Sequence, residues 1–427
     1  MQSKYAVSQL PFNPADPCIL HLDLNSCFAS IEQQANPLLR GKPVAVAAYT
    51  SPLGCIIAPS VEAKRLGIKV GMRVRDGISI YRDLIVLSPD PWKYRVVHLK
   101  IKKLLDSFSS VVIAKSIDEF AVDFDYSYLG KTHIWESAME IKNRIMKEVG
   151  DWLRVSIGIA PNRFLAKLAS NLHKPDGLDE INKDNFYECF SNLKLPDLPY
   201  IKTRNTIRLN SVGINTVLDF YNAPLWKLKS AFLSVNSYYW YLRLHGYEID
   251  NILFGRKSYG NSYALPKSFS EISDLSPIIL KLVEKTSFRL RHAGYTALGV
   301  HLAINYRNGL FWHKGMKLRK ELFDSMEIYK KMIMILQLCP YKHSVREIFV
   351  SVFDLKKHPG LQLNLFEDVL RKRHLVNSLD EINERWGNFV ISPARMAMCD
   401  RNAVPDRIAF GGVKELEEFT LREESVI

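Results

Sequence analysis

The chain has 427 residues, of which 47% are hydrophobic and 24% are charged, and its formal net charge is +13. This composition is ordinary for globular proteins, so it excludes a largely disordered or collagen-like chain, and the length suggests about two to four domains. The sequence has no run of about 18 apolar residues, no apolar signal segment and no C-x-x-C pair, so we expect no membrane span, no secretory signal and a reducing, intracellular setting.

The first part of the chain predicts a strand at 19–23 (ILHLD), which ends on an acidic residue. A helix is expected at 26–33, a second strand at 43–48 and a short helix at 60–66. Gly67 follows that helix immediately, and glycine is a common residue just after a helix end.

The next part predicts a helix at 93–108 after Pro91, with one apolar face formed by Val96, Leu99, Ile101, Leu104 and Leu105. Two strands, 111–114 and 120–124, flank the turn 116–119. A helix at 137–149, a strand at 155–159 and a helix at 163–172 that Asn162 can cap complete this region. The order predicts an α+β layer, an antiparallel-rich sheet covered by helices on one face.

Residues 183–244 lack strand patterns and predict a small all-helical unit, whereas 257–354 mixes strands and helices as a second α+β module. The positive charge is uneven, because 255–360 carries 18 basic and 8 acidic side chains, a net of +10. A basic module is typical of proteins that bind a polyanion, although a soluble basic surface without a partner is equally compatible with it.

Three acidic side chains fall where the predicted sheet can bring them together. Asp23 ends one strand, and Asp118 and Glu119 lie at a hairpin tip. Clustered carboxylates repel each other unless cations neutralise them. Oxygen ligands suit Mg²⁺, and two such ions form the clamp used for in-line phosphoryl displacement.

The residues around these acids resemble the motifs of the Y-family (translesion) DNA polymerases, closest to bacterial polymerase IV and V catalytic subunits. The resemblance runs from about residue 18 to about residue 360. The matching segments, in chain order, are 23–32 (DLNSCFASIE), 41–46 (GKPVAV), 116–119 (SIDE), 158–170 (GIAPNRFLAKLAS) and 174–177 (KPDG). Several ordered motifs are more specific than any single one.

The resemblance implies a right-handed polymerase with a ferredoxin-like palm, small fingers, a helical thumb and an α+β little finger. It places the palm at 18–26 and 90–181, the fingers at 27–89, the thumb at 182–247, a linker at 248–256, the little finger at 257–360 and a C-terminal tail at 361–427. We have no functional interpretation for residues 370–427.

Specific positions take family roles through the same resemblance. Asp23, Asp118, Glu119 and the Leu24 carbonyl match the ligands of two Mg²⁺ ions. Phe28 matches the aromatic steric gate beneath the sugar, which disfavours a 2′-hydroxyl. Lys174 and Lys64 match cations that bind the triphosphate. Much of the family has Tyr-x-x-Arg where this chain has VEAK at 61–64, and a point charge does not replace a bidentate guanidinium.

The DNA-binding positions are also carried over. The segment 209–216 (LNSVGINT) resembles half of the thumb's helix–hairpin–helix, whereas the usual Gly-Ile-Gly turn is replaced by YIK at 200–202. In the little finger, Lys257, Ser258 and Arg307 are expected to contact phosphates. The segment after that domain looks like the sliding-clamp-binding peptide of bacterial polymerases, through Gln362, Leu363, Leu365 and Phe366.

The implied function is template-directed, Mg²⁺-dependent DNA synthesis across lesions at low fidelity and without proofreading. The implied partners are primer–template DNA, deoxynucleoside triphosphates and a sliding clamp, and the implied setting is the cytoplasm and nucleoid of a bacterium, with a monomeric catalytic subunit. Two alternatives stay open: a non-catalytic DNA-binding scaffold that recruits another polymerase, and another two-metal enzyme on a similar palm, such as a nucleotide cyclase.

Overall fold

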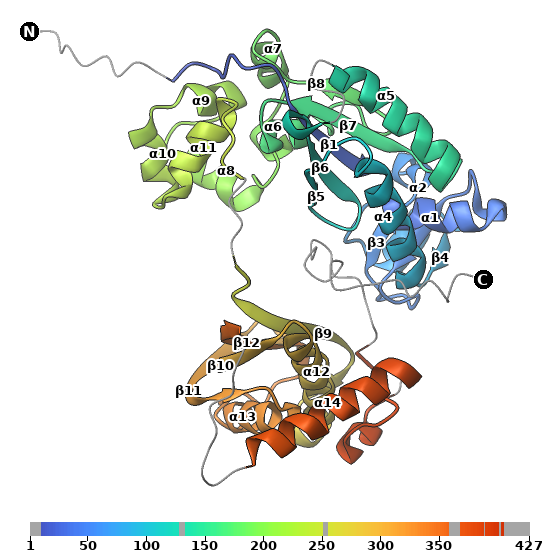
Figure 1. Cartoon of the computed structure of the whole chain (residues 1–427), viewed down its shortest axis with the longest axis vertical. Coiled ribbons are helices and arrows are strands. Elements are labelled where there is room, and N and C mark those ends of the chain that lie inside the picture. The colour runs from blue at the N-terminus through green and yellow to red at the C-terminus, as the bar shows by residue number, and fades with distance from the viewer. Residues whose placement is uncertain are drawn as a thin grey trace, which may run out of the picture. The chain divides into compact units, whose positions relative to one another are not determined.

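A computed structural model describes residues 10–127, 133–250, 255–357, 368–387, 389–400 and 403–404, and these fall into two units that divide between residues 252 and 253. Figure 1 labels the elements of both units, which are described separately below. Within the described part of the chain, no helix combines the length and the apolar character that a bilayer crossing requires.

The first unit is built on a five-stranded sheet with the strand order β5-β6-β1-β7-β8. Strand β1 lies between β6 and β7 and is antiparallel to both, while β7 and β8 are parallel. Strands β1, β5, β6 and β7, with the intervening helices, follow the β-α-β-β-α-β order of ferredoxin-like folds. The bounds are β1 Ile19–Leu24, β5 Val112–Ala114, β6 Glu119–Asp123, β7 Val155–Ala160 and β8 Leu178–Glu180.

Helices cover both faces of this sheet, so the expectation of helices on one face was wrong. Helices α4 (Pro91–Leu105) and α5 (Ile134–Arg144, continued by a π-helical turn, Ile145–Val149) pack on the face that carries Leu20, Leu22 and Leu24. Helix α6 (Arg163–Ala169) packs on the other face (Figure 1). It approaches β7 at Gly158, where a Cβ would lie 2.1 Å from the Ala166 carbonyl oxygen, so a side chain there would push the helix off the sheet.

Helix α4 begins at Pro91, two residues earlier than predicted, because Asp90 caps it through the backbone N–H groups of Trp92 and Lys93. Its fully buried side chains are Tyr94, His98, Ile101, Leu104 and Leu105. Val96 and Leu99, which the sequence assigned to the buried face, are only half-buried. Two polar rings therefore lie on the face that packs against the sheet.

A smaller sheet with the order β3-β2-β4 lies in the segment between β1 and α4. It encloses a small apolar core that includes Ala45, Ile56 and Ile68. Ser60 accepts a hydrogen bond from the Ala63 N–H at 3.2 Å and so starts α2 where the sequence predicted a helix. The bounds in this segment are α1 Cys27–Ala35, a 3₁₀ turn Pro37–Leu39, β2 Val44–Ala47, β3 Ile56–Pro59, α2 Val61–Arg65, α3 Val74–Ile80 and β4 Ile85–Leu87.

The helical cluster that follows β8 shares a core with α6 and contains no strand, as the sequence predicted. Asn162 caps α6 with its Oδ1, and its amide nitrogen donates to the carbonyls of Arg243 and Tyr247, which fastens the end of the cluster to the sheet. The helices are α7 Phe186–Ser191, α8 Thr203–Asn210, α9 Val217–Asn222, α10 Leu225–Phe232 and α11 Asn236–Leu244.

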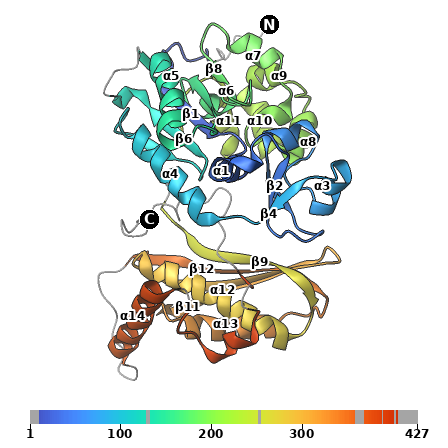
Figure 2. The same ribbon diagram turned by 90° about the vertical axis from the view of Figure 1, so that its right-hand side faces the viewer.

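The second unit is a four-stranded antiparallel sheet with the order β11-β10-β12-β9, and α12 and α13 cover one face of it (Figure 2). The bounds are β9 Ser258–Phe269, α12 Ile272–His292, β10 Tyr295–Tyr306, β11 Phe311–Leu322, α13 Ser325–Gln337, β12 Val345–Lys357, α14 Val369–Trp386 and a 3₁₀ turn Ala394–Met398.

This unit extends beyond the predicted boundary at residue 360. Helix α14 is held by Arg291, whose Nε and Nη2 donate to the two oxygens of Asp380 at 2.6 and 2.7 Å. Met396 and Val404 are buried in the same core as α12 and α13. Residues 368–387, 389–400 and 403–404 are therefore part of the folded second unit.

Candidate functional site

The pairing of β1 with β6 brings the three predicted acidic residues together. Asp23 lies directly opposite Glu119 in the antiparallel register, and the Leu24 N–H donates to the Asp118 carbonyl at 2.9 Å. The carboxylates therefore meet at one end of two neighbouring inner strands, where β1 ends and β6 begins. This is the arrangement that the strand–turn–strand prediction required.

Two lysines neutralise part of this cluster. The Nζ atom of Lys174 lies 2.7 Å from Asp23 Oδ2, and Lys167 on α6 donates a hydrogen bond to Glu119 Oε2. The loop that carries Lys174 is held by Asn25, whose Oδ1 accepts from the Asp176 N–H at 2.7 Å. Cationic groups thus occupy positions beside two of the three acids.

The electrostatics of the cluster favour an added cation. Burial raises the pKa of Asp118 to about 6. The charges of Asp23 and Glu119 also raise this pKa, whereas a hydrogen bond from Ser116 lowers it. Burial also raises the pKa of Asp23, although Lys174 opposes this. Carboxylates with raised pKa values are held in a charged state at a cost, which a bound metal ion removes.

His21 joins this cluster, and the sequence analysis assigned it no role. Its side chain is fully buried, and its Nε2 lies 3.9 Å from Glu119 Oε2. Ligand atoms of His21, Asp23 and Glu119 all lie within 4.8 Å of one another. The sequence could have predicted this position, because residues two apart on a strand point to the same face, and His21 precedes Asp23 by two.

The imidazole of His21 is neutral in this setting. Burial lowers its pKa well below the ordinary value, and the charges of Lys167, Lys174 and Lys115 lower it further. Neither ring nitrogen has a hydrogen-bond partner among the described residues.

The other predicted nucleotide-binding positions lie near the three acids. Burial lowers the pKa of Lys64 in α2, and the charge of Lys174 lowers it further, whereas Asp23 and Asp118 raise it, so all four groups interact. Phe28 on α1 is 3% exposed and stacks on Tyr94 with ring centroids 4.3 Å apart. Tyr94 in turn donates from its hydroxyl to Glu32 at 2.9 Å, which fixes the ring under Phe28.

The turn at 200–202 reaches this site by an unpredicted contact. Tyr200 adopts a left-handed backbone with φ of +65°, a conformation that costs a non-glycine residue free energy. The Nζ atom of Lys167 lies 5.7 Å from the centre of its ring. The lysine that bonds Glu119 therefore also contacts the helical cluster.

The predicted DNA contacts of the second unit lie far apart on its sheet. Lys257 and Ser258 are exposed at the start of β9, where Ser258 pairs with Phe353. Arg307 is exposed just after β10, at the opposite end, and its Nη2 donates to the Leu265 carbonyl at 3.2 Å. The predicted clamp peptide, residues 362–366, lies outside the described residues.

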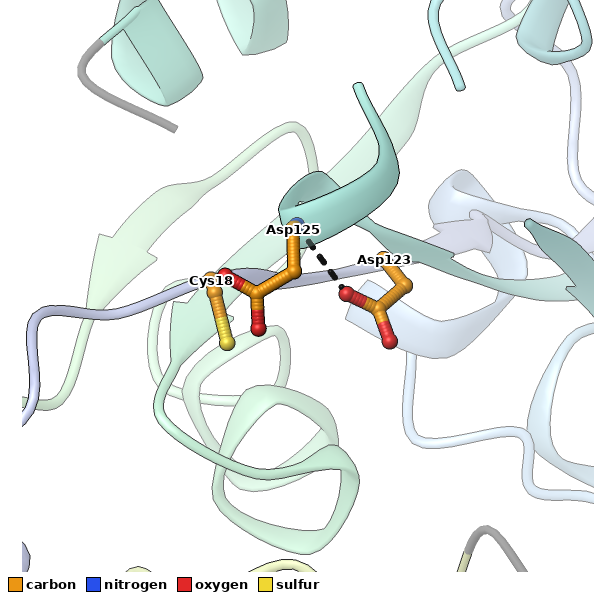
Figure 3. Close-up of side chains that lie close together, drawn as sticks. All are labelled: Cys18, Asp123 and Asp125. Carbon is orange, nitrogen blue, oxygen red and sulfur yellow. Dashed lines mark hydrogen bonds between the residues drawn. The ribbon is translucent and has the colours of Figure 1, made fainter. Parts of the chain in front are cut away.

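A second group of donor atoms lies at the other end of β1, and Figure 3 shows its members, Cys18, Asp123 and Asp125. Asp123 Oδ1 accepts a hydrogen bond from the Asp125 N–H at 3.1 Å, and Arg163 Nη2 lies 3.9 Å from Asp123 Oδ2. These contacts describe an acidic turn with a cationic neighbour, and we assign it no ligand.

Family models match two segments of the chain. Residues 22–171 match the impB/mucB/samB family, and residues 256–365 match the C-terminal domain of the same family. The first match contains Asp23, Asp118, Glu119, Lys167 and the segment around them. The second match begins just before β9 and covers the sheet of the second unit.

Similar proteins of known name include DNA polymerases IV. The chain is 31% identical over 379 residues to that of Pelotomaculum thermopropionicum, covering 87% of this chain and 94% of the relative. It is 29% identical over 389 residues to that of Oceanobacillus iheyensis, covering 88% and 90%. Among solved structures, a Y-family DNA polymerase chimera aligns with a TM-score of 0.70 at 23% identity, over 80% of this chain and 99% of the other.

Proposed function

Because the chain belongs to the Y-family of DNA polymerases, the impB/mucB/samB family, and is a DNA-directed DNA polymerase, we propose that the carboxylate cluster at the end of β1 is the centre of a two-metal translesion synthesis site. The observation that carries this proposal is the register that sets Asp23 opposite Glu119, with Asp118 beside them.

The donor set fits two Mg²⁺ ions. Asp23, Asp118, Glu119 and the Leu24 carbonyl supply only oxygen ligands, which hard divalent ions prefer. Bound there, the ions would activate the primer 3′-hydroxyl and neutralise charge on the transferred phosphate. Burial raises the pKa values of Asp23 and Asp118, which supports this fit because a bound cation would favour the charged form of each carboxylate.

The lysines act on the substrate side of the same site. Lys174 and Lys167 bond Asp23 and Glu119 in the protein alone. With divalent ions bound to those acids, the two ammonium groups would be available to bind the triphosphate and its leaving group. Positioning and charge stabilisation are the main contributions of a protein to phosphoryl transfer. Lys64 adds a third cation in the same electrostatic neighbourhood.

Phe28 selects the sugar of the incoming nucleotide. The ring is held flat against Tyr94, so it cannot turn away from a 2′-hydroxyl without losing a stacking contact. Deoxynucleotides are therefore preferred over ribonucleotides.

Low fidelity follows from the small size of the segment 27–89, which we assign as the fingers. It contains one three-stranded sheet and three helices of nine residues or fewer. Such a short roof constrains the nascent base pair weakly and tolerates damaged templates. We further propose that synthesis proceeds without proofreading.

The second unit supplies the contact with primer–template DNA. Its segment 255–360 carries a net charge of +10, and Lys257, Ser258 and Arg307 are exposed at its sheet ends. Contacts of this kind bind phosphates without reading sequence and weaken as salt rises. We further propose that residues 362–366 bind a sliding clamp and that the polymerase acts as a monomer.

Primer extension with Mg²⁺ tests the proposed function. Asp118→Ala and Glu119→Ala should each abolish extension, because each removes a carboxylate ligand of the proposed site, while primer–template affinity stays close to that of the wild type. Asp125→Ala is the matched control, since it removes an acid at the opposite end of β1, and it should extend normally. Extension by either of the first two variants would remove the metal-site assignment, and a wild type that binds DNA without extending it would favour a scaffold role.

A further inference from the structure

His21 is the one member of the carboxylate cluster that the proposed two-magnesium site does not use. A fully buried polar ring without a hydrogen-bond partner is costly, and native proteins rarely retain such a group without a role. Replacing it by an apolar ring of similar size would remove this cost. Its place in the cluster therefore calls for a ligand that the described residues do not supply.

The geometry around His21 fits a metal ion. Its ring nitrogen, a carboxylate oxygen of Asp23 and one of Glu119 all lie within 4.8 Å of one another. Two ligands about 2.1 Å from one ion lie roughly 3–3.5 Å apart at octahedral or tetrahedral angles. The observed 3.9 Å between His21 Nε2 and Glu119 Oε2 needs a closure of less than an ångström.

The chemistry of this donor set differs from that of the three acids alone. Mg²⁺ prefers oxygen ligands, whereas imidazole nitrogen favours ions such as Zn²⁺, Co²⁺ and Fe²⁺. We propose that His21, Asp23 and Glu119 form a mixed nitrogen–oxygen site that binds an imidazole-preferring divalent ion of the Zn²⁺ type in competition with Mg²⁺. The inference rests on the proposed function in one respect, since two of its three ligands are shared with the magnesium site.

Because the mixed site and the magnesium site share two ligands, an ion in the mixed site should inhibit DNA synthesis. An ion held by His21 occupies Asp23 and Glu119, so these acids cannot hold Mg²⁺ at the same time. Lys167 and Lys174 must leave their carboxylates for either ion to bind. The choice between the two classes of ion therefore depends on the single nitrogen ligand.

Titration of the metal-free full chain with Co²⁺ tests the proposal, because the visible absorption of Co²⁺ reports its ligands directly. His21→Phe should weaken Co²⁺ binding by about tenfold or more, and Mg²⁺ binding by less than about threefold. His245→Phe is the matched control, since His245 is also buried but lies in the helical cluster and donates from Nδ1 to the Tyr241 carbonyl. It should leave both affinities unchanged.

Equal Co²⁺ affinity in the wild type and in His21→Phe overturns the proposal, and so does an equal loss for both ions. His21→Gln provides a second variant of similar polarity if the phenylalanine variant does not fold. The ring ¹⁵N signals of His21 in the wild type give a test without any variant: they should shift when Zn²⁺ is added, and unchanged signals at saturating Zn²⁺ refute a nitrogen ligand. Mg²⁺-dependent extension by the wild type is measured separately, so polymerase function can stand while the mixed site fails.

Discussion

Removing the ammonium group of Lys167 should destabilise the metal-free protein more than the Mg²⁺-bound protein. Lys167 bonds Glu119, and the two side chains are only 21% and 19% exposed. Without the lysine, Glu119 lies beside Asp23 and Asp118 and has no other cation in bonding contact among the described residues. Lys167→Met keeps the length of the apolar stem and removes the charge alone.

The magnitude follows from the burial of the pair. Removing one partner of a fully buried ion pair costs roughly 3–5 kcal/mol. The residual exposure of both side chains reduces this to about 2 kcal/mol, a typical value for a hydrogen bond between charged groups. If Glu119 binds Mg²⁺ as proposed, the ion would neutralise Glu119 in place of the lysine, and the same substitution should cost less than about 1 kcal/mol when the ion is bound.

Urea denaturation, carried out once with a chelator and once with saturating Mg²⁺, measures the loss of unfolding free energy in each condition. Lys372→Met is the control, because Lys372 pairs with Glu327 at 2.5 Å in the second unit with a similar exposed fraction, and Mg²⁺ should not reduce the effect of that substitution. The same loss of stability for Lys167→Met in both conditions would refute the reasoning, since it would show that the lysine stabilises the fold through its packing.

Three further changes test other parts of the chain. Phe28→Ala should raise ribonucleotide incorporation at least about tenfold and lower stability by about 3 kcal/mol, because it removes a buried stacked ring; unchanged sugar selectivity in nucleotide-competition assays would count against a steric gate. Replacing Leu365 and Phe366 together by alanine should cancel stimulation by a bacterial sliding clamp while extension without the clamp continues, and persistent stimulation would place clamp binding elsewhere. Asp380→Ala should lower the stability of the second unit by about 2 kcal/mol and speed amide hydrogen exchange in α14, because Arg291 loses a bidentate partner; unchanged exchange would show that apolar contacts alone hold the helix.

Periodicity and capping predicted most elements of the first unit. Strand β1, helix α6 with its Asn162 cap and the all-helical character of 183–244 agree with the sequence. Strand β8 was missed because Leu178–Glu180 has one apolar residue in three, and its pairing is a tertiary contact with β7 that no local pattern records.

The buried face of α4 was misassigned for a related reason. Tyr94 and His98 are buried because their polar atoms have partners, Glu32 and the Ile117 carbonyl, on other segments. A hydropathy pattern treats both as surface residues, since it does not include partners that the fold supplies. The result is a helix face that contains a tyrosine and a histidine where the sequence expected Val96 and Leu99.

The residues of the candidate site also differ in how far the sequence could predict them. The acids were found because their motifs are local, and Asp118 and Glu119 stand next to each other in the chain. Lys167 lies within a quoted motif, but its partner Glu119 is 48 residues away, so no spacing rule indicated the pair. Tyr200 was noticed only as a departure from Gly-Ile-Gly, and its contact with Lys167 depends on the packing of the helical cluster against the sheet.

The position of the acids is ultimately determined by apolar residues that face away from them. Leu20, Leu22 and Leu24 are buried beneath α4 and α5, and the alternation of a strand then sends His21 and Asp23 to the opposite face. A slip of one residue in β1 would expose the leucines to α6 and bury the acid under α4, so the apolar burial of three side chains opposes it. The arrangement of the acids therefore depends on the core, and a substitution such as Leu22→Asp should disturb the candidate site through the register, although Leu22 itself faces the helices.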